Sequence, residues 1–401
     1  MFTKDPWHEV RGFIDAFNSN MVTAFTPGKF ITVDEIMSAW KGLCGIYNAD
    51  GLPHKTKIQR KPEGQGAELK ALACAETNII LRLDLMEGKD ANRLKAYVAE
   101  FGEGTAVVLR LCSPYAGTGR FVVADSAFSS IKCCIAVYCI LGLFFGGMVK
   151  TAHMHFPKDF LKNWFRDEDA RHKADPVGYL RGSWITLQST FTNTRNALDL
   201  TPHILYAVGW ADKKMKMLVC NFGTSIQCPD DCERRRKQKV TDPLTGLYET
   251  IDFVKRIKQP DFVKKIFDAF PPIDINDHYR QGILELERSW LTVRWWIRIF
   301  TTLLGVIVVN CYFAFRCEQR RRQLFRGEES TDFINFIGKL AYELIFNPFV
   351  PQNVADNIRR RHEDNDDDDI YDVSDFYQIK VLRSSVSVYL VLFYLSGSRG
   401  P

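Results

Sequence analysis

The first 150 residues alternate short apolar runs with helix-like stretches, and this alternation restricts the chain to the α/β class. Residues Trp7 to about Phe25 have helical spacing, with Val10, Phe13 and Phe17 on one face. A second helix is expected over 130–143. Strands are expected over 29–34, over two runs between 67 and 86 that turn back near 76–78, and over 107–111, 120–124 and 147–150.

Beyond residue 150 the pattern changes to a β-rich segment and then to helices. Strands are expected over 184–191, 204–210 and 216–222. From Asp261 the chain becomes helical, with a long helical stretch over 274–316 and a last helix over 331–346. The acidic run after Pro351 is low in complexity, which predicts a disordered acidic tail over 353–401.

The composition is that of a globular protein. Hydrophobic residues make up 46% of the 401 and charged residues 25%, which excludes a wholly disordered chain, a collagen and a coiled-coil rod. The net charge of +5 is unevenly distributed, because residues 363–401 carry −5 and residues 1–362 carry +10. A basic body favours a polyanionic partner such as nucleic acid.

Eleven cysteines are scattered through apolar stretches, unlike the dense, regular spacing of a secreted disulfide framework. The chain opens on polar and charged residues, without the pattern of a signal peptide. We therefore expect an intracellular, reducing compartment. Cys220, Cys228 and Cys232 lack a fourth ligand at zinc-site spacing, so no structural zinc is predicted.

Three uncharged apolar runs bear on a membrane. Residues 133–149 and 299–315 are 17 residues long and 384–398 is 15, all shorter than the roughly 20 residues of a spanning helix. The first two are interpreted as buried core, and no membrane partner is expected of them. The third leaves open a membrane protein anchored by its tail.

Three aspartates stand where metal ligands would be expected. Asp34 and Asp125 each close a predicted strand, and Asp274 begins a helix with Asp277 one turn later. Converging carboxylates can hold two divalent metals that activate a water or 3′-hydroxyl at a phosphodiester. By spacing alone the alternative stays open, since Asp is also common at strand ends and as a helix cap.

Five segments, in this order, carry a resemblance to a known family: Val33–Gly42, Arg60–Lys70, Asp125–Ser130, Ile273–Asp277 and Arg294–Arg298, followed by Asn310. Together they make the chain resemble the transposase domain of piggyBac transposable element-derived proteins, over roughly residues 7–349. The resemblance implies an RNase H-like core interrupted by a β-rich insertion, followed by a helical region.

The implied site consists of Asp34, Asp125 and Asp274 as catalytic metal ligands, with Asp277 as a fourth catalytic acidic residue. The implied chemistry is DNA transposition by Mg²⁺- or Mn²⁺-dependent cleavage and strand transfer. The implied partners are double-stranded transposon ends with TTAA targets and a second copy of the chain. Nuclear localisation is expected.

The resemblance also implies a domain plan. It places an N-terminal helical remnant in 1–27, the core in 28–180 and 261–290, the insertion in 181–260, and a helical region for DNA binding or dimerisation in 291–352. Two basic segments are candidate DNA contacts. The first is a predicted loop with Arg234, Arg235, Arg236 and Lys237, and the second is a helix end with Arg320, Arg321 and Arg322.

Two features depart from the family. Ser126 and Ala127 follow Asp125 where relatives usually have Asn and an aromatic residue, and no cysteine follows Cys317 where relatives often carry a zinc module. A partial or inactive element is therefore an alternative, as is a catalytically dead, domesticated DNA-binding protein of the same fold.

Overall fold

The computed structural model describes residues 5–346, apart from 46–49, 60, 62, 151–152, 154, 175–179, 194, 197–198, 200, 242–247 and 327–330. The chain divides into two compact units, residues 1–306 and 307–401. The acidic tail and the apolar run 384–398 lie outside the described residues.

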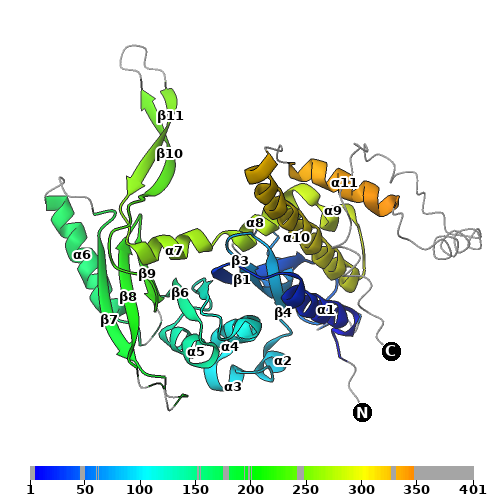
Figure 1. Ribbon diagram of the computed structural model, residues 1–401, viewed down its shortest axis with the longest axis horizontal. Coiled ribbons are helices and arrows are strands. Elements are labelled where there is room, and N and C mark those ends of the chain that lie inside the picture. Colours follow the sequence, from blue (N-terminus) through cyan, green and yellow to red (C-terminus); the bar gives the residue numbers. More distant parts are fainter. Residues whose placement is uncertain are drawn as a thin grey trace, which may run out of the picture. The chain divides into compact units, whose positions relative to one another are not determined.

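A nine-stranded mixed sheet organises the first unit (Figure 1). Its strands are β1 (Phe30–Ala39), β2 (Thr56–Lys57), β3 (Gln65–Cys74), β4 (Ile80–Leu85), β5 (Phe121–Ala124), β6 (Phe144–Met148), β7 (Trp184–Phe191), β8 (His203–Ala211) and β9 (Met215–Cys220). Their order is β2-β3-β1-β5-β6-β9-β8-β7, with β4 also paired to β3. Strands β1, β5 and β6 are parallel to one another, and the other pairs are antiparallel.

The helices follow the same chain order. They are α1 (His8–Ala24), α2 (Lys89–Arg93), α3 (Val98–Phe101), α4 (Glu103–Cys112), the 3₁₀ turn η1 (Ser113–Tyr115), α5 (Ile131–Leu141), α6 (Lys158–Ala174), α7 (Asp261–Ala269), α8 (Pro272–Tyr279), the π-helical turn η2 (Arg280–Leu284), α9 (Leu286–Ser289), α10 (Trp295–Arg326) and α11 (Phe333–Ile345). Helices α4 and α5 pack against each other, α1 lies along β4, and α8 contacts β1 and β3.

The centre of the sheet is buried because its strands are apolar on both faces, as strands of parallel pairs usually are. Ile31, Val33 and Ile36 of β1 are 0% exposed. A second part of the core forms where Phe262 and Ile266 of α7 pack over β8 and β9. The β-rich segment that follows residue 180 therefore continues the main sheet through the pairing of β9 with β6.

Two further strands pair only with each other among the described residues: β10 (Cys232–Thr241) and β11 (Tyr248–Ile257). They form the separate two-stranded ribbon drawn in Figure 1. The prediction of a loop at Arg234–Lys237 is thus wrong, because these residues lie inside β10, where they pair with residues 252–255 of β11. A strand can contain these four basic residues because successive side chains project to opposite faces of the ribbon, where long cationic side chains stay solvated.

Several local predictions are confirmed. The predicted N-terminal helix is α1, and the predicted hairpin is β3–β4, with Asn78 at φ 61° in its turn. Residues 184–191 form β7 with the expected bounds. The helix predicted over 130–143 is α5, whose first turn is capped by the Ser130 side chain accepting from the Cys133 amide. The last predicted helix is α11, capped by Asp332.

Four local predictions are wrong. Residues 107–111 are helical, in α4, since a short apolar run does not distinguish a buried strand from a buried helix. The first strand continues five residues past Asp34, to Ala39. The strand expected at 147–150 is β6, which begins three residues earlier, at Phe144, and ends at Met148. The single helical stretch over 274–316 is divided, with Glu285 in the left-handed region and residues 290–294 outside any helix.

Within the described residues, one helix has the length and composition of a membrane span, over Trp295–Arg320 of α10. Of its most apolar 18 residues, 67% are buried inside the protein. In the second unit, Tyr312 of α10 stacks edge-on against Phe333 of α11, with ring centroids 4.8 Å apart. This burial matches the interpretation of residues 299–315 as a core helix.

Removing a large side chain from the core beneath α7 should destabilise the fold. Phe262 is 0% exposed, so Phe262→Ala should lower the free energy of unfolding by about 3–5 kcal/mol, measured by urea denaturation. Phe160→Ala is the matched control, because Phe160 is 53% exposed and should change stability little. Equal effects of the two substitutions would contradict this description of the core.

Candidate functional site

Asp34 and Asp125 lie next to each other on neighbouring strands. Strands β1 and β5 run parallel with Val33 opposite Ala124; Asp34 is the next residue of β1, and Asp125 directly follows the end of β5. Both side chains are half-buried. Equivalent positions on adjacent parallel strands face the same side of a sheet, so this register favours the same side for the two carboxylates.

Close packing fixes the end of β5. The Asp125 carbonyl accepts hydrogen bonds from the amides of Phe128 and Ser129, which turns the chain towards α5. Gly147 of β6 lies alongside, and a Cβ there would come within 2.5 Å of the Ala124 carbonyl oxygen. A glycine is therefore required beside the residue that precedes Asp125.

Burial and the neighbouring carboxyl group of Glu35 have the largest effects on the pKa of Asp34. Burial, followed by the hydrogen bond and negative charge of Glu35, raises the pKa of Asp34 to about 8. The nearby ammonium of Lys61 and the Glu35 amide, which donates to Asp34 Oδ1 at 2.8 Å, act in the opposite direction. Asp34 thus keeps its proton at neutral pH unless a further positive charge approaches.

Asp274 and Asp277 come from α8, which begins at Pro272. Both line a cavity of about 310 Å³ together with Met37 of β1 and Lys61. Asp274 is exposed, whereas Asp277 forms ion pairs with Lys61 at 3.5 Å and with Arg280 at 2.7 Å. The two aspartates of α8 therefore differ, since Asp277 is neutralised by two cations.

Lys61 connects β1 to α8. Its ammonium donates to the Glu35 carbonyl at 2.5 Å and pairs with Asp277. One side chain thereby reaches the backbone of the strand that carries Asp34 and the helix that carries Asp274. Lys61 lies in the segment Arg60–Lys70 that carries the family resemblance, and no role was predicted for it.

A buried arginine makes the second connection. Arg280 is 1% exposed, donates to the Met37 carbonyl at 3.3 Å and forms ion pairs with Asp277 and with the buried Glu287. The π-helical turn that begins at Arg280 widens the helix at this point. Sequence reasoning missed Arg280, although its position three residues after Asp277 is the spacing of a helical ion pair.

The carboxylates of the candidate site can be compared with the ligands that a divalent cation requires. The described residues contain no group of three or more His, Cys, Asp or Glu side chains arranged to hold a metal, and this includes Cys220, Cys228 and Cys232. Mg²⁺ usually keeps several waters and binds through one or two carboxylates together with substrate phosphates. The pair Asp34 and Asp125 fits this mode, and the raised pKa of Asp34 reflects its burial and the neighbouring Glu35.

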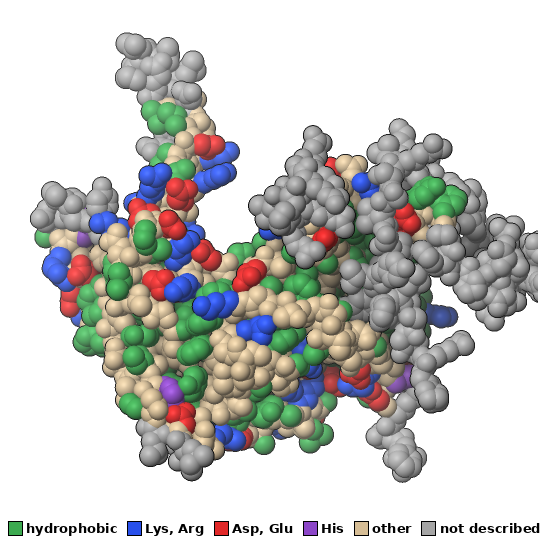
Figure 2. Space-filling model, viewed as in Figure 1, with side chains coloured by type: hydrophobic (Ala, Val, Ile, Leu, Met, Phe, Trp, Pro, Cys, Tyr) green, Lys and Arg blue, Asp and Glu red, His purple; other side chains and the backbone are tan. Residues whose placement is uncertain are grey.

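The basic residues predicted as DNA contacts have different surroundings. On the ribbon, Arg235 and Lys237 are exposed and Arg234 pairs with Asp212 at 3.4 Å. Figure 2 shows Lys and Arg side chains gathered along this ribbon. Arg320 is exposed on α10, whereas the side chains of Arg321 and Arg322 lie outside the described residues.

The Asp34 environment predicts how stability depends on pH. Because the folded pKa of about 8 exceeds the ordinary 3.8, the folded state holds the extra proton between these values, and stability falls as pH rises through this window. Asp34→Asn removes this dependence. Between about pH 5 and pH 8 the free energy of unfolding of the variant should therefore rise by at least about 1 kcal/mol relative to that of wild type. Urea denaturation in EDTA measures this, and parallel pH profiles would contradict it.

The Arg280 network predicts a large loss of stability. Arg280→Met leaves the buried Glu287 without its cation and Asp277 with Lys61 alone, so the free energy of unfolding should fall by about 3–5 kcal/mol. Arg93→Met is the control, because Arg93 pairs with Asp90 at 4.0 Å on the surface and should have little effect. A small loss for Arg280→Met would show that α8 is held by other contacts.

Comparison with known proteins identifies the family. A family model described as Transposase IS4 matches residues 2–312. A solved structure described as the cryo-EM structure of a piggyBac transposase synaptic complex with hairpin DNA matches with a TM-score of 0.54 at 18% identity. The match covers 88% of this chain and 62% of that chain, so this chain spans less than two thirds of that relative.

The comparison with curated proteins found no match. At 18% identity the structural likeness concerns the fold alone, and the family model, over most of the chain, carries the assignment. The resemblance inferred from the five sequence segments is confirmed: the chain belongs to the transposase IS4 family and has a mixed α/β fold similar to that of piggyBac transposase.

Proposed function

We propose that this protein is a transposase-type DNA-processing enzyme that cuts and transfers DNA strands with Mg²⁺ or Mn²⁺ at Asp34, Asp125 and Asp274. The observation that carries the proposal is the parallel register of β1 and β5, which sets Asp34 beside Asp125 while α8 packs against β1. The family assignment supports the reaction class.

We further propose that the core is RNase H-like. The strand order β4-β3-β1-β5-β6 supports this assignment, with antiparallel pairing up to β1 and parallel pairing from β1 to β6. Helices α4 and α5 cover this half of the sheet, and α8 returns to it after the strands β7–β11. The insertion before the third aspartate would then comprise β7–β11, in keeping with the proposed domain plan.

Each side chain would have a separate role in the chemistry. A bound cation pair would activate the attacking hydroxyl and stabilise the leaving oxygen. Asp34 and Asp125 would hold it, with Asp34 losing its proton as the cation binds. Asp274 faces the adjoining cavity and would complete the site from α8. Asp277, the fourth acidic residue, would act through Lys61 and Arg280 as a positioning residue.

The partner in this proposal is double-stranded DNA. The solved relative was captured with hairpin DNA, which supports a DNA partner here. The ribbon residues Arg234 to Lys237 and the end of α10 at Arg320 to Arg322 are proposed contacts, since a two-stranded β-ribbon fits the major groove. Recognition of TTAA targets, assembly as a homodimer and nuclear localisation complete the proposal, all by family resemblance.

Nicking of supercoiled plasmid tests the proposal. The purified chain is incubated with Mg²⁺ or Mn²⁺ beside Asp34→Asn, Asp125→Asn and Asp274→Asn. Loss of a metal-holding carboxylate should reduce nicking at least about 100-fold, the scale of a catalytic electrostatic contact. Asp90→Asn is the matched control, because the Asp90 side chain is 99% exposed and remote from these residues in the fold.

The outcomes separate the proposal from its alternative. Metal-dependent nicking that the three substitutions abolish and Asp90→Asn preserves is the expected result. Equal background nicking by all versions would contradict catalysis. The chain would then be a catalytically inactive, DNA-binding member of the same family.

A further inference from the structure

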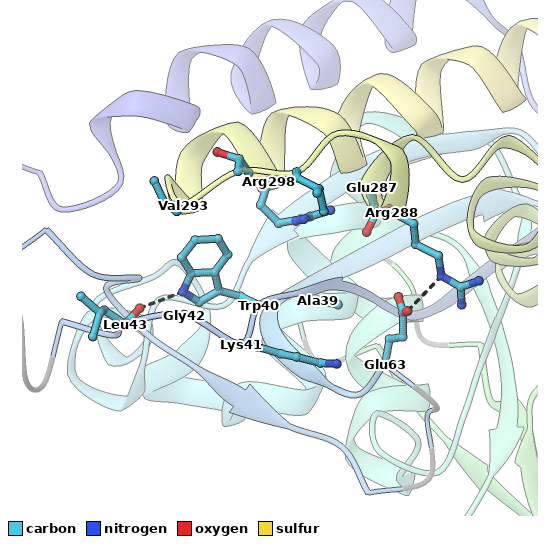
Figure 3. A pocket seen from close by; sticks show the side chains of 12 residues that line it. Ala39, Trp40, Lys41, Gly42, Leu43, Glu63, Glu287, Arg288, Val293 and Arg298 are labelled. Carbon is cyan, nitrogen blue, oxygen red and sulfur yellow. Dashed lines mark hydrogen bonds and ion pairs between the residues drawn. The ribbon is translucent and has the colours of Figure 1, made fainter. Parts of the chain in front are cut away.

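A groove of about 600 Å³ lies between the turn that follows β1 and the segment that joins α9 to α10. We refer to this feature, between residues 39–43 and residues 288–298, as the Trp40 groove. Figure 3 shows Val293 and Arg298 on one side and Trp40 and Leu43 on the other. The Trp40 ring nitrogen donates to the Leu43 carbonyl at 2.7 Å, which holds this turn in place.

Three large apolar side chains at the groove project into solvent. Leu291 is 84% exposed, Val293 is 92% exposed and Leu43 is 61% exposed. The Thr292 hydroxyl accepts a hydrogen bond from the Arg294 amide at 3.0 Å, so the segment 291–293 has a local restraint. Apolar groups displayed in this way would be unfavourable in water unless a partner covers them.

The groove carries an excess of positive charge. Its two carboxylates are already paired, Glu63 with Arg288 at 3.2 Å and Glu287 with the buried Arg280. Among the residues that the structure describes, Lys41 and Arg298 in the groove, and the exposed Arg294 beside it, have no carboxylate within ion-pair distance. The partner that fits is therefore an anion with apolar surface accessible beside its charges.

Arg298 is the most constrained of these cations. Burial lowers the pKa of its guanidinium, and its buried Nε has no acceptor in the described part of the chain. The Arg298 side chain is half-buried and lines the groove, so an acceptor arriving there can form hydrogen bonds with its guanidinium. A phosphate oxygen is such an acceptor, because guanidinium groups bind phosphate with charge-assisted hydrogen bonds.

The groove is continuous with the candidate catalytic cavity. Glu63 and Arg288 line both the Trp40 groove and the cavity that contains Asp274 and Asp277. A strand bound along the groove would thus lead towards the proposed reacting site. This continuity selects DNA over a protein or a lipid as the occupant.

We propose that the segment Leu291–Val293 is a wedge that inserts between base pairs of duplex DNA, while Lys41, Arg294 and Arg298 contact the flanking phosphates. Apolar side chains inserted at a base step, flanked by cations, are a general means of unstacking and kinking a duplex. The inference rests on the proposed function. It adds that the protein deforms its substrate beside the site of chemistry.

Fluorescence of 2-aminopurine in duplex DNA tests the wedge without any chemistry. The probe is a duplex of about 30 base pairs with 2-aminopurine at its TA steps, which are the most easily unstacked, and the buffer contains EDTA. Wild-type protein should raise the fluorescence several-fold on binding. The double variant Leu291→Ser, Val293→Ser should bind the duplex within about tenfold of wild type but lose most of this rise.

Two control variants separate the wedge from general surface effects. Leu94→Ser changes a leucine that is 90% exposed elsewhere in the first unit, and it should keep the full fluorescence rise. Arg298→Gln should weaken binding and lower the slope of log affinity against log salt by about one, whereas Arg93→Gln should not.

Retention of the fluorescence rise by the double variant, or its equal loss in Leu94→Ser, would overturn the wedge. The wedge would also be overturned if light scattering showed a changed oligomeric state of the double variant while its unstacking of DNA stayed intact. If wild-type protein fails to bind duplex DNA, both this inference and the DNA partner of the proposed function fail. Unstacking without plasmid nicking would contradict catalysis alone, and nicking without unstacking would contradict the wedge alone.

Discussion

The arrangement of the candidate site depends on the hydrogen bond and ion pairs of the Arg280 guanidinium. This side chain is 1% exposed, and a charge removed from water in this way must be paired and hydrogen-bonded to be tolerated. Its partners lie on three segments, Met37 on β1, Asp277 on α8 and Glu287 on α9. The position of α8 against β1 is therefore set by polar contacts, whereas most of the sheet is held by apolar packing.

The same contacts explain why the two halves of the candidate site differ in character. Asp34 and Asp125 are placed by backbone pairing between β1 and β5, which tolerates changes in side chains. Asp274 is placed by a helix whose docking depends on Lys61 and Arg280. The strand half of the site is therefore built into the sheet, and the helix half depends on the ion pairs of two charged side chains.

Sequence reasoning recovered the elements whose patterns are local. The hairpin β3–β4, the strand β7 and the capped helices α5 and α11 each carry a periodicity or a cap that needs no distant partner. Helix α4 was missed because its apolar run Val107–Leu111 is buried on nearly every side and shows no periodicity. The break between α8 and α10 was missed because it depends on Glu285 adopting positive φ within a tertiary network.

For the candidate site, the apolar runs before Asp34 and Asp125 correctly predicted strands there, although β1 continues past Asp34 to Ala39. The roles of Lys61 and Arg280 had no such signal, since each acts across a gap of more than 25 residues to a backbone carbonyl. Long-range contacts from a single side chain leave no repeated spacing in a sequence. They become visible only when the fold brings the two segments together.

The ribbon β10–β11 has a consequence for edge-to-edge pairing with other extended chains. Among the described residues its strands pair only with each other, so each offers a free edge of backbone donors and acceptors to any other extended chain. Its exposed Tyr248, Ile251 and Phe253 would favour such pairing. The cations Arg235, Lys237 and Arg256 oppose it, because two copies stacked edge to edge would bring like charges together. The cations proposed to contact DNA thus also oppose edge-to-edge pairing of the ribbon.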